Sequence, residues 1–313
     1  MKFTKSVVLA LKGCAMGMAD VVPGVSGGTI AFISGIYEEL IDSIRSVDAT
    51  ALRLLAHLRL GELWRHVNGR FLLPVLTGIA IAVFSLARLM TYLLEHHPIE
   101  IWSFFFGLIV ASALLVSKQI GRWDWRTAAA LAVGAAAAWW ITVATPTETP
   151  NDWWFVMLSG AVAICAMILP GISGAFILLL LGKYQYIMQA VGDLNIPVIA
   201  IFAVGAAVGI ISFSHLLSWL LKRWHDVTVA VLMGFMVGSL NKVWPWKETV
   251  ETYTDSHGVL QPLVERNIAP GHFEALYDKP SLLAEAVLLC AAGFLAIYGI
   301  ELLARIVLKK REE

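Results

Sequence analysis

The sequence PGVSGG at residues 23–28 returns as PGISGA at residues 170–175, with only two residues changed. Each copy interrupts a long apolar stretch near its middle, the first in residues 5–45 and the second in residues 153–191. The arms beside each turn are about 15 residues long, or roughly 22 Å of helix, whereas a hydrocarbon core is about 30 Å thick. Non-helical backbone at membrane depth is tolerated only where protein buries it or where it faces water. We therefore predict that both stretches are re-entrant helical hairpins rather than full crossings.

The composition places the chain in a membrane. Hydrophobic residues make up 58% and charged residues 15% of the 313, against roughly 25% charged in soluble domains, and the mean hydropathy is +0.75. These values exclude a soluble enzyme, a nucleic-acid-binding protein and a secreted disulfide-linked scaffold. Lys plus Arg and Asp plus Glu both total 23, so the net charge does not indicate the charge of a partner.

Six further apolar segments are candidate membrane spans, because each approaches the roughly 20 residues that a crossing helix needs. The residues 46–70 place leucines between arginines, which predicts an amphipathic interfacial helix on the inner membrane surface. Residues 244–280 are expected to form a long outer loop. The predicted spans are residues 71–94, 99–118, 126–145, 197–221, the shorter 227–243, and 281–306.

The two halves of the chain are related in sequence. Residues around the first turn recur 147 positions later, as Gly35 and Tyr37 do at Gly182 and Tyr184. Residues of the following spans recur 127 positions later, and the insertion of residues 46–70 explains the change of offset. We therefore predict an all-α polytopic membrane protein of two repeats, each a re-entrant hairpin followed by three transmembrane helices. The repeats are residues 1–145 and 146–313.

The orientation of the repeats follows from counting crossings. Three spans separate the two hairpins, so the second hairpin enters from the opposite face of the membrane. Such inverted repeats are typical of secondary transporters, whose sites lie near the membrane midplane. The distribution of basic residues agrees with this topology and predicts that both termini are cytoplasmic. A full crossing by residues 5–45 would instead place five arginines outside: Arg45, Arg53, Arg59, Arg65 and Arg70.

A short helix is expected to begin after each turn, and helix N-termini present free N–H groups and a positive dipole end to anions. Two such tips meeting at the midplane would form a donor-rich pocket suited to phosphate. The alternative is that proline and glycine only tighten the turn while serine caps the helix. The duplication and the membrane depth favour the pocket. The candidate phosphate-binding residues at the tips are Ser26, Gly27, Gly28, Thr29, Ser173 and Gly174, and the turns are Pro23, Gly24, Pro170 and Gly171.

Charged residues near the hairpins are further candidates. Asp20 lies beside the first tip and could carry a proton or bind a cation, or it could cap the hairpin. Arg88 and His215 occupy matching positions inside spans and could hold an anionic head group, or Arg88 could extend to the membrane surface and His215 could be a core residue. Lys183 could bind a lipid phosphate at the outer surface, or its side chain could simply extend to the membrane–water interface. Glu38 is either a coupling residue or, with Glu39, a solvated helix end.

The sequence contains no nucleophile–base arrangement, ATPase phosphate-binding loop or metal-ligand motif. We therefore expect no catalytic residue, no metal and no cofactor, and we expect transport to use a gradient.

The longest motif covers residues 17–31, GMADVVPGVSGGTIA, preceded by Lys12-Gly13 and followed by GIYE at residues 35–38. Together with LPGISG at residues 169–174, it resembles the signature of the bacterial polyprenyl-phosphate translocases, formerly catalogued as domain of unknown function 368. The resemblance extends over nearly the whole chain.

The resemblance implies transport of undecaprenyl phosphate across the bacterial cytoplasmic membrane, which returns this carrier lipid for envelope synthesis. The expected partners are the polyprenyl-phosphate lipid and membrane lipids, and no nucleic acid is expected. Whether the protein forms a homo-oligomer stays an open question. Two alternatives remain at this point. A transporter or channel for small anions would keep the same tips but lack a lipid-sized lateral opening. A membrane-embedded phospholipid enzyme would need an acid–base pair, and only Asp20 is available.

Overall fold

The computed structural model describes residues 3–21, 26–144, 149–254 and 260–309. The turn residues Pro23 and Gly24 lie outside the described residues, as does the side chain of Arg88. The chain is predominantly helical, and the helices of the first half are α1 (Phe3–Val21), α2 (Gly27–Ile33), α3 (Tyr37–Arg45), α4 (Ala49–Ala56), α5 (Leu60–His66), α6 (Gly69–His96), α7 (Pro98–Ser117) and α8 (Trp125–Val143).

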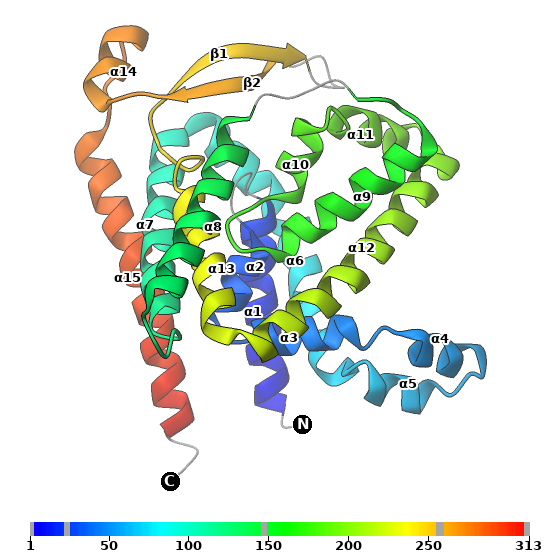
Figure 1. Cartoon of the computed structure of the whole chain (residues 1–313). Coiled ribbons are helices and arrows are strands. Elements are labelled where there is room, and N and C mark those ends of the chain that lie inside the picture. Colours follow the sequence, from blue (N-terminus) through cyan, green and yellow to red (C-terminus); the bar gives the residue numbers. More distant parts are fainter. Residues whose placement is uncertain (1–2, 22–25, 145–148, 255–259, 310–313) are drawn as a thin grey trace.

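The second half contains helices and one small sheet. Its elements are α9 (Trp153–Ile168), α10 (Gly174–Leu180), α11 (Tyr184–Gly192), α12 (Ile196–Arg223), α13 (His225–Ser239), β1 (Lys247–Thr254), β2 (Leu260–Asn267), α14 (Pro270–Tyr277) and α15 (Leu283–Lys309). Figure 1 shows that α1 begins and α15 ends at the same end of the molecule, beside α4 and α5. The sheet and α14 lie at the opposite end.

Several helices are suited to cross a membrane, so the chain is a multi-pass membrane protein. Within the described residues, α7, α8 and α12 are each long and apolar enough for a crossing. Two bent pairs would raise the number to five, namely α5 with α6, bent by 78°, and α10 with α11, bent by 112°. The span predicted at residues 227–243 is the 15-residue α13, which begins at His225 and ends at Ser239.

The hairpin arms differ from the continuous arms that we predicted. The first arm, α1, is a helix of 19 residues, and the returning arm is broken into α2 and α3. The break is at Gly35, whose φ of 69° is left-handed, and the matching Gly182 has φ 60° between α10 and α11. At the break beside Gly35, Ile36 N–H donates to Ala31 O (3.0 Å), as in a Schellman motif. The recurrence of glycine at these two positions therefore marks a second turn in each half.

Four helix pairs make the most extensive contacts: α1 with α6, α9 with α12, α8 with α13, and α7 with α15 (Figure 1). Glycines permit this close packing. A Cβ on Gly78 of α6 would overlap the carbonyl of Ala10 in α1, and a Cβ on Gly205 of α12 would overlap the carbonyl of Met157 in α9. Small residues of this kind let helix backbones approach in membranes. Glycine therefore recurs 127 positions apart, at Gly78 and Gly205, because both positions lie where two helix backbones contact each other.

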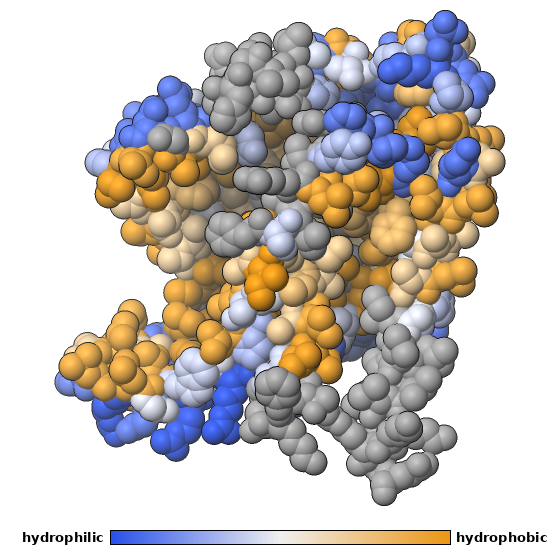
Figure 2. All heavy atoms as spheres, turned by 180° about the vertical axis from the view of Figure 1, so that it is seen from behind, coloured by the Kyte–Doolittle hydropathy of each residue, from blue (hydrophilic) through white to orange (hydrophobic). Residues whose placement is uncertain are grey.

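The inserted segment is two short helices, α4 and α5, rather than one helix. They are separated at Leu58, which has a left-handed φ of 52°. Asp48 caps α4, and its Oδ1 accepts from Thr50 N–H (2.8 Å) and Ala51 N–H (2.9 Å). Figure 2 shows that this projecting segment is hydrophobic on the face toward the rest of the molecule and hydrophilic on the other. The segment is therefore amphipathic, and its place at the membrane interface stays a prediction.

The predicted outer loop is partly ordered into strands, so the all-α expectation holds except for this small sheet. β1 and β2 pair antiparallel, from Lys247 opposite Asn267 to Thr254 opposite Leu260. Two tryptophans join this outer segment to its surroundings. Trp244 Nε1 donates to Ile268 O (2.9 Å), and Trp246 Nε1 donates to Ser281 O (2.8 Å) just before α15.

Candidate functional site

The two repeated turns lie against each other near the centre of the molecule. Ser26 Oγ donates to Met167 O (2.9 Å), and Gly171 N–H donates to Thr29 Oγ1 (2.9 Å). A third contact comes from Tyr37, whose hydroxyl donates to Ile168 O (3.1 Å). These hydrogen bonds join residues 131 to 142 positions apart in the chain. We call this contact the tip junction, formed by residues 26–29 and Tyr37 with residues 167–171.

The first three N–H groups of α2 are already paired within the protein. Gly27 N–H donates to Asp20 Oδ1 (2.6 Å), and Gly28 N–H donates to Ser26 Oγ (3.1 Å). Thr29 N–H donates to Ser26 O (2.9 Å). The carboxylate of Asp20 thus takes the position that an anion would occupy at a helix N-terminus. In this conformation Asp20 caps the first tip, which is one of the two roles that its position suggested.

The first tip is also tightly enclosed. Ser26 is 1% exposed and Thr29 is fully buried. A Cβ on Gly28 would overlap the carbonyl oxygen of Ile168 in the opposite tip. Glycine is therefore needed here because the backbones of the two turns approach directly.

The second tip is capped differently. Ser173 occupies the N-cap position of α10, but its side chain makes no capping hydrogen bond. Gly171 has φ +89°, a conformation that favours glycine, and a Cβ there would lie 2.8 Å from Phe235 O on α13. Gly174 is buried against the preceding arm, where a Cβ would lie 2.6 Å from Ala163 O. The two tips are thus similar in backbone but unequal in polar partners.

Lys183 is a buried cation rather than a surface one. The side chain is 1% exposed, and its ammonium donates to Thr149 O (2.7 Å) and to Asn151 Oδ1 (2.6 Å). The same ammonium lies over the rings of Phe155 and Tyr186, at 5.6 and 5.8 Å from their centroids. A lipid phosphate could reach it only by replacing these partners, so neither surface role suggested by the sequence describes this conformation.

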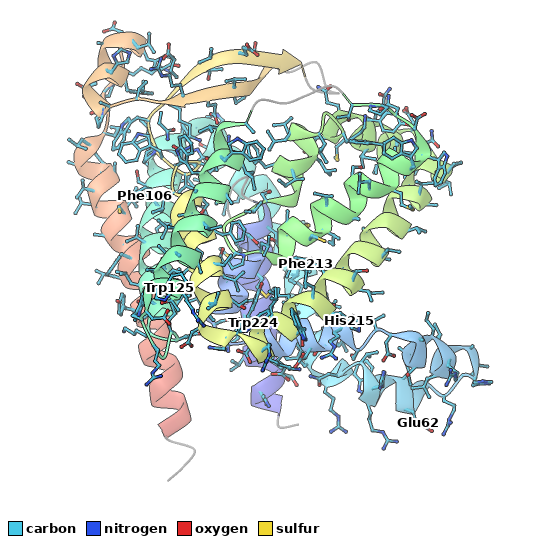
Figure 3. All side chains as sticks on the ribbon, viewed as in Figure 1. Glu62, Phe106, Trp125, Phe213, His215 and Trp224 are labelled. Carbon is cyan, nitrogen blue, oxygen red and sulfur yellow. The ribbon has the colours of Figure 1, made fainter. Side chains whose placement is uncertain are left out.

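The side chains of the remaining polar candidates are exposed. His215 is exposed on the lower half of α12, where Nδ1 contacts Ile211 O at 2.8 Å (Figure 3). The Glu38 side chain is 65% exposed and lies 3.4 Å from His225 Nε2. Glu39 Oε1 accepts from Asn68 Nδ2 (3.1 Å), so both glutamates belong to a solvated helix end. Within the described residues, no group of three or more His, Cys, Asp or Glu side chains could hold a metal ion.

Sequence reasoning missed a second junction between the halves, at the end where the chain termini lie. Asp42 of α3 accepts from Ser218 Oγ of α12 (2.6 Å) and pairs with Lys222 Nζ (2.9 Å). Arg45 Nη1 also donates to Ser218 Oγ (3.2 Å). We call these four side chains the inner junction. No local pattern indicates it, because its partners lie more than 170 positions apart.

Comparisons with known proteins identify the family of this chain. Residues 16–261 match the model of a family described as undecaprenyl phosphate translocase-like. A polyprenyl-phosphate transporter of Vibrio cholerae is 47% identical over 93% of this chain and 94% of its own length. A polyprenyl-phosphate transporter of Staphylococcus aureus is 33% identical over 75% of this chain and 85% of its own length. No solved structure matches significantly. With a family match over most of its length, the chain belongs to the undecaprenyl phosphate translocase-like family.

Proposed function

We propose that this protein is a translocase for undecaprenyl phosphate in the bacterial cytoplasmic membrane, and that it returns the carrier lipid for envelope synthesis. The names of its two relatives support a polyprenyl-phosphate substrate. The observation that carries the proposal is the tip junction, in which two copies of one polar turn meet inside an otherwise apolar protein. Such a polar turn at membrane depth is costly without a function.

The head-group phosphate would bind between the two tips while the polyprenyl tail stays in the bilayer. Its ligands would be the N–H groups of Gly27, Gly28 and Gly174 and the hydroxyls of Ser26, Thr29 and Ser173. Because the donors of the first tip are paired in this conformation, the phosphate would replace protein partners. Arg88 is the proposed counter-charge, since guanidinium suits phosphate.

The tips would serve two inverted repeats that alternate access to the two leaflets, with both termini cytoplasmic. Helix boundaries support the repeats: α3 and α11 begin 147 positions apart, at Tyr37 and Tyr184, and α6 and α12 are both 28 residues long. The unequal packing of the halves supports the alternation. α3 packs on α12 through the inner junction, whereas the corresponding α11 and α6 are not an extensively packed pair among the described residues. Alternation would close the end that holds the inner junction and open its counterpart, and then reverse this arrangement.

Asp20 would couple transport to protons. Its carboxylate occupies the first N–H of α2, so protonation would weaken this contact and free the donor for phosphate. Asn at position 20 keeps an acceptor oxygen for Gly27 N–H but cannot titrate. We expect Asp20→Asn to fold normally and to lose the dependence of transport on a pH gradient. Transport by Asp20→Asn that still follows the gradient would exclude Asp20 as the coupling group.

The test of the function uses purified protein in liposomes that carry labelled undecaprenyl phosphate, with head-group accessibility followed from each side. We expect protein-dependent movement that Ser26→Ala strongly reduces. The control is Ser34→Ala in the same hairpin, because Ser34 Oγ donates only within its own helical turn, to Ala31 O (3.3 Å). Lipid movement unchanged in Ser26→Ala would contradict the site. Flux of inorganic phosphate without lipid movement would indicate a small-anion transporter, and product formation would indicate an enzyme instead.

A further inference from the structure

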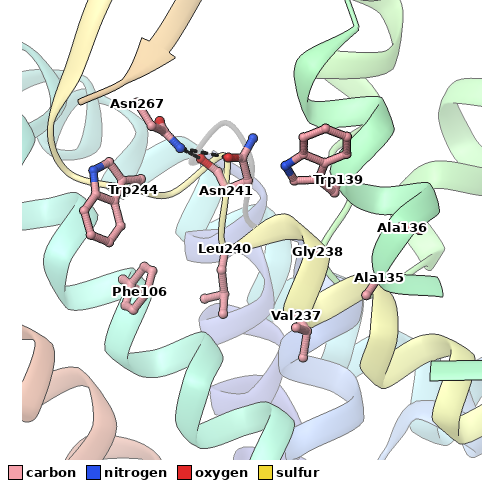
Figure 4. A pocket seen from close by; sticks show the side chains of 10 residues that line it. All are labelled: Phe106, Ala135, Ala136, Trp139, Val237, Gly238, Leu240, Asn241, Trp244 and Asn267. Atoms are coloured by element: carbon pink, nitrogen blue, oxygen red, sulfur yellow. Dashed lines mark hydrogen bonds between the residues drawn. The ribbon is translucent and has the colours of Figure 1, made fainter. Parts of the chain in front are cut away.

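An apolar groove opens between α7 and α8, with the end of α13 as its floor and with Trp244 and Asn267 of the segment 244–280 at its edge (Figure 4). Its volume is about 500 Å³. Phe106 of α7, Trp139 of α8 and Leu240 after α13 line it, and Asn241 and Asn267 form a polar rim. Asn267 Nδ2 donates to Asn241 O (2.8 Å) and to Asn241 Oδ1 (2.9 Å), which holds this rim together.

The mouth of the groove lies on the exposed side of α8. Trp139 is 53% exposed, and Ala136, one turn earlier on α8, is also exposed. α8 is among the helices long enough to cross the membrane, and only Thr127, Gly134 and Ala138 are buried along it. A chain lying in the lipid can therefore enter the groove sideways. A cavity of several hundred Å³ accommodates a drug-sized apolar segment, which here corresponds to the first isoprene units of a long tail.

Two lysines and one glutamate form a charged cluster beside the groove. Glu265 Oε2 lies 2.9 Å from Lys242 Nζ and 3.3 Å from Lys247 Nζ. One carboxylate thus serves two ammonium groups, and one positive charge has no acidic partner within this cluster. Burial, together with the charge of Lys242, lowers the pKa of Lys247 to about 8, although Glu265 opposes this shift.

The cluster is continuous with the rim of the groove. Asn241 directly precedes Lys242 in the chain. Asn267 follows Glu265 by two positions on β2, so both side chains lie on the same face of the strand. The excess positive charge therefore lies next to the two asparagines that close the polar side of the groove.

The same lysines connect the groove with the second hairpin. Lys247 Nζ lies 4.5 Å from the ring centroid of Trp102, which is one helical turn from Phe106 on α7. Lys242 Nζ lies 4.8 Å from the ring centroid of Phe176, the third residue of α10. An anion held at Lys242 would thus lie near the side chain of a residue in the first turn of α10, the helix that follows the second tip.

We propose that this groove and Lys242 form the outer-leaflet docking site of the lipid, which holds it before its phosphate passes to the tips. The first isoprene units lie in the groove between α7 and α8, over the end of α13, and the phosphate binds at Lys242 with the asparagine rim. This inference rests on the proposed function. The apolar lining suits a polyprenyl tail, and the excess positive charge of the cluster suits an anionic head group.

The test uses undecaprenyl phosphate that carries a photoreactive diazirine near the head-group end of the tail, added to the full-length protein in liposomes. Labelled peptides are mapped by mass spectrometry. Ala136→Trp fills the mouth of the groove, and its matched control is Ala132→Trp, an exposed position one turn away that does not line the groove. Lys242→Gln removes the head-group partner, with the exposed Lys279→Gln as its control. The undecaprenol of the same tail and inorganic phosphate serve as competitors.

We expect labelling of α8 and α13 in the wild type and in both controls. Ala136→Trp should reduce it about tenfold or more, and Lys242→Gln should reduce it about tenfold, the value of one charge-assisted hydrogen bond. Undecaprenol and inorganic phosphate should compete weakly, because each lacks one half of the ligand. Competition by undecaprenol as strong as by the phosphate lipid would overturn the role of Lys242.

The groove and the proposed function can fail separately. If the wild type moves the lipid and both Ala136→Trp and Lys242→Gln move it at the same rate with unchanged labelling, the docking site is wrong and the function stands. If the wild type moves no lipid in either direction, the function fails, and with it the inference. Equal thermal midpoints of the two variants and the wild type show that the variants are folded.

Discussion

The tip junction predicts a measurable effect of one isosteric substitution, Thr29→Val. Thr29 is fully buried, and its Oγ1 accepts the hydrogen bond of Gly171 N–H at 2.9 Å. Valine keeps the shape of threonine but cannot accept, so the Gly171 N–H would be left unpaired in a buried position. A buried donor without a partner costs about 1–3 kcal/mol. We therefore expect the closed junction to be destabilised relative to an opened one by about 5- to 150-fold.

Hydrogen exchange at the Gly171 amide measures this opening directly. We expect the peptide that contains residues 168–172 to exchange about 5- to 150-fold faster in Thr29→Val than in the wild type. The control is Thr228→Val. Thr228 is 6% exposed, and its hydroxyl donates only to Trp224 O, which the Thr228 N–H also reaches at 2.9 Å. No polar group loses its last partner there, so exchange at residues 168–172 should not change.

The result that would refute this reasoning is an unchanged exchange rate at Gly171 in a folded Thr29→Val protein. It would mean that the Thr29–Gly171 hydrogen bond does not hold the tips together. Faster exchange in Thr228→Val as well would mean that the effect is not local to the junction. The measurement needs no substrate, so it is independent of the proposed transport.

Two further predictions concern packing and pH. Gly78→Leu should force α1 away from α6 and lower the free energy of unfolding by about 3 kcal/mol or more, which a lower thermal midpoint in detergent would show. The control is Gly61→Leu, where an added Cβ would have no other atom within 4 Å, so the thermal midpoint of this variant should equal that of the wild type. Because the pKa of buried Lys247 is lowered from 10.5 to about 8, the unfolded chain binds an extra proton between these values, and this residue's contribution to stability rises with pH across that window. Lys247→Met should therefore be more stable than the wild type at pH 7, by at most about 3 kcal/mol, with a difference that shrinks towards pH 10; a constant difference would contradict the lowered pKa.

The sequence predicts a structural feature where the residues that cause it are close together in the chain or occur in both repeats. Hydropathy located α6, α7, α8, α12 and α15, because a crossing helix must be long and apolar. The repeated turns indicated one site built from both tips; residues of the two turns are hydrogen-bonded to each other, and their binding of phosphate stays a prediction. The recurrence of Gly35 at Gly182 was visible, but its meaning was not, because a glycine in a helical pattern can serve packing, a break or a cap.

Other features depend on long-range contacts that no local pattern contains. The burial of Lys183 depends on Thr149 and Asn151, which come from the loop before α9. The strands β1 and β2 are not predicted from the sequence because β1, KETVETYT, is polar, which favours a loop, although its threonines, valine and tyrosine favour a strand. The inner junction forms only when α3 meets α12, so its side chains looked like ordinary surface charges.

The pairing of the tips also explains how one polar site could exist in apolar surroundings both with and without a ligand. In the present conformation Asp20 and Ser26 satisfy the first N–H groups of α2, so no buried donor is left unpaired there. A phosphate that displaced Asp20 from Gly27 N–H would exchange one anion for another. The site would then avoid most of the free-energy cost of a buried N–H group that has no hydrogen-bond partner before the ligand binds. At the position in the second half that matches Asp20, Met167 contributes a backbone carbonyl, which accepts from Ser26. The two matching positions thus supply different acceptors, a carboxylate to Gly27 N–H and a carbonyl to Ser26 Oγ. Protonation of Asp20 would therefore alter the first helix terminus and, through the neighbouring Ser26, the junction that this terminus forms.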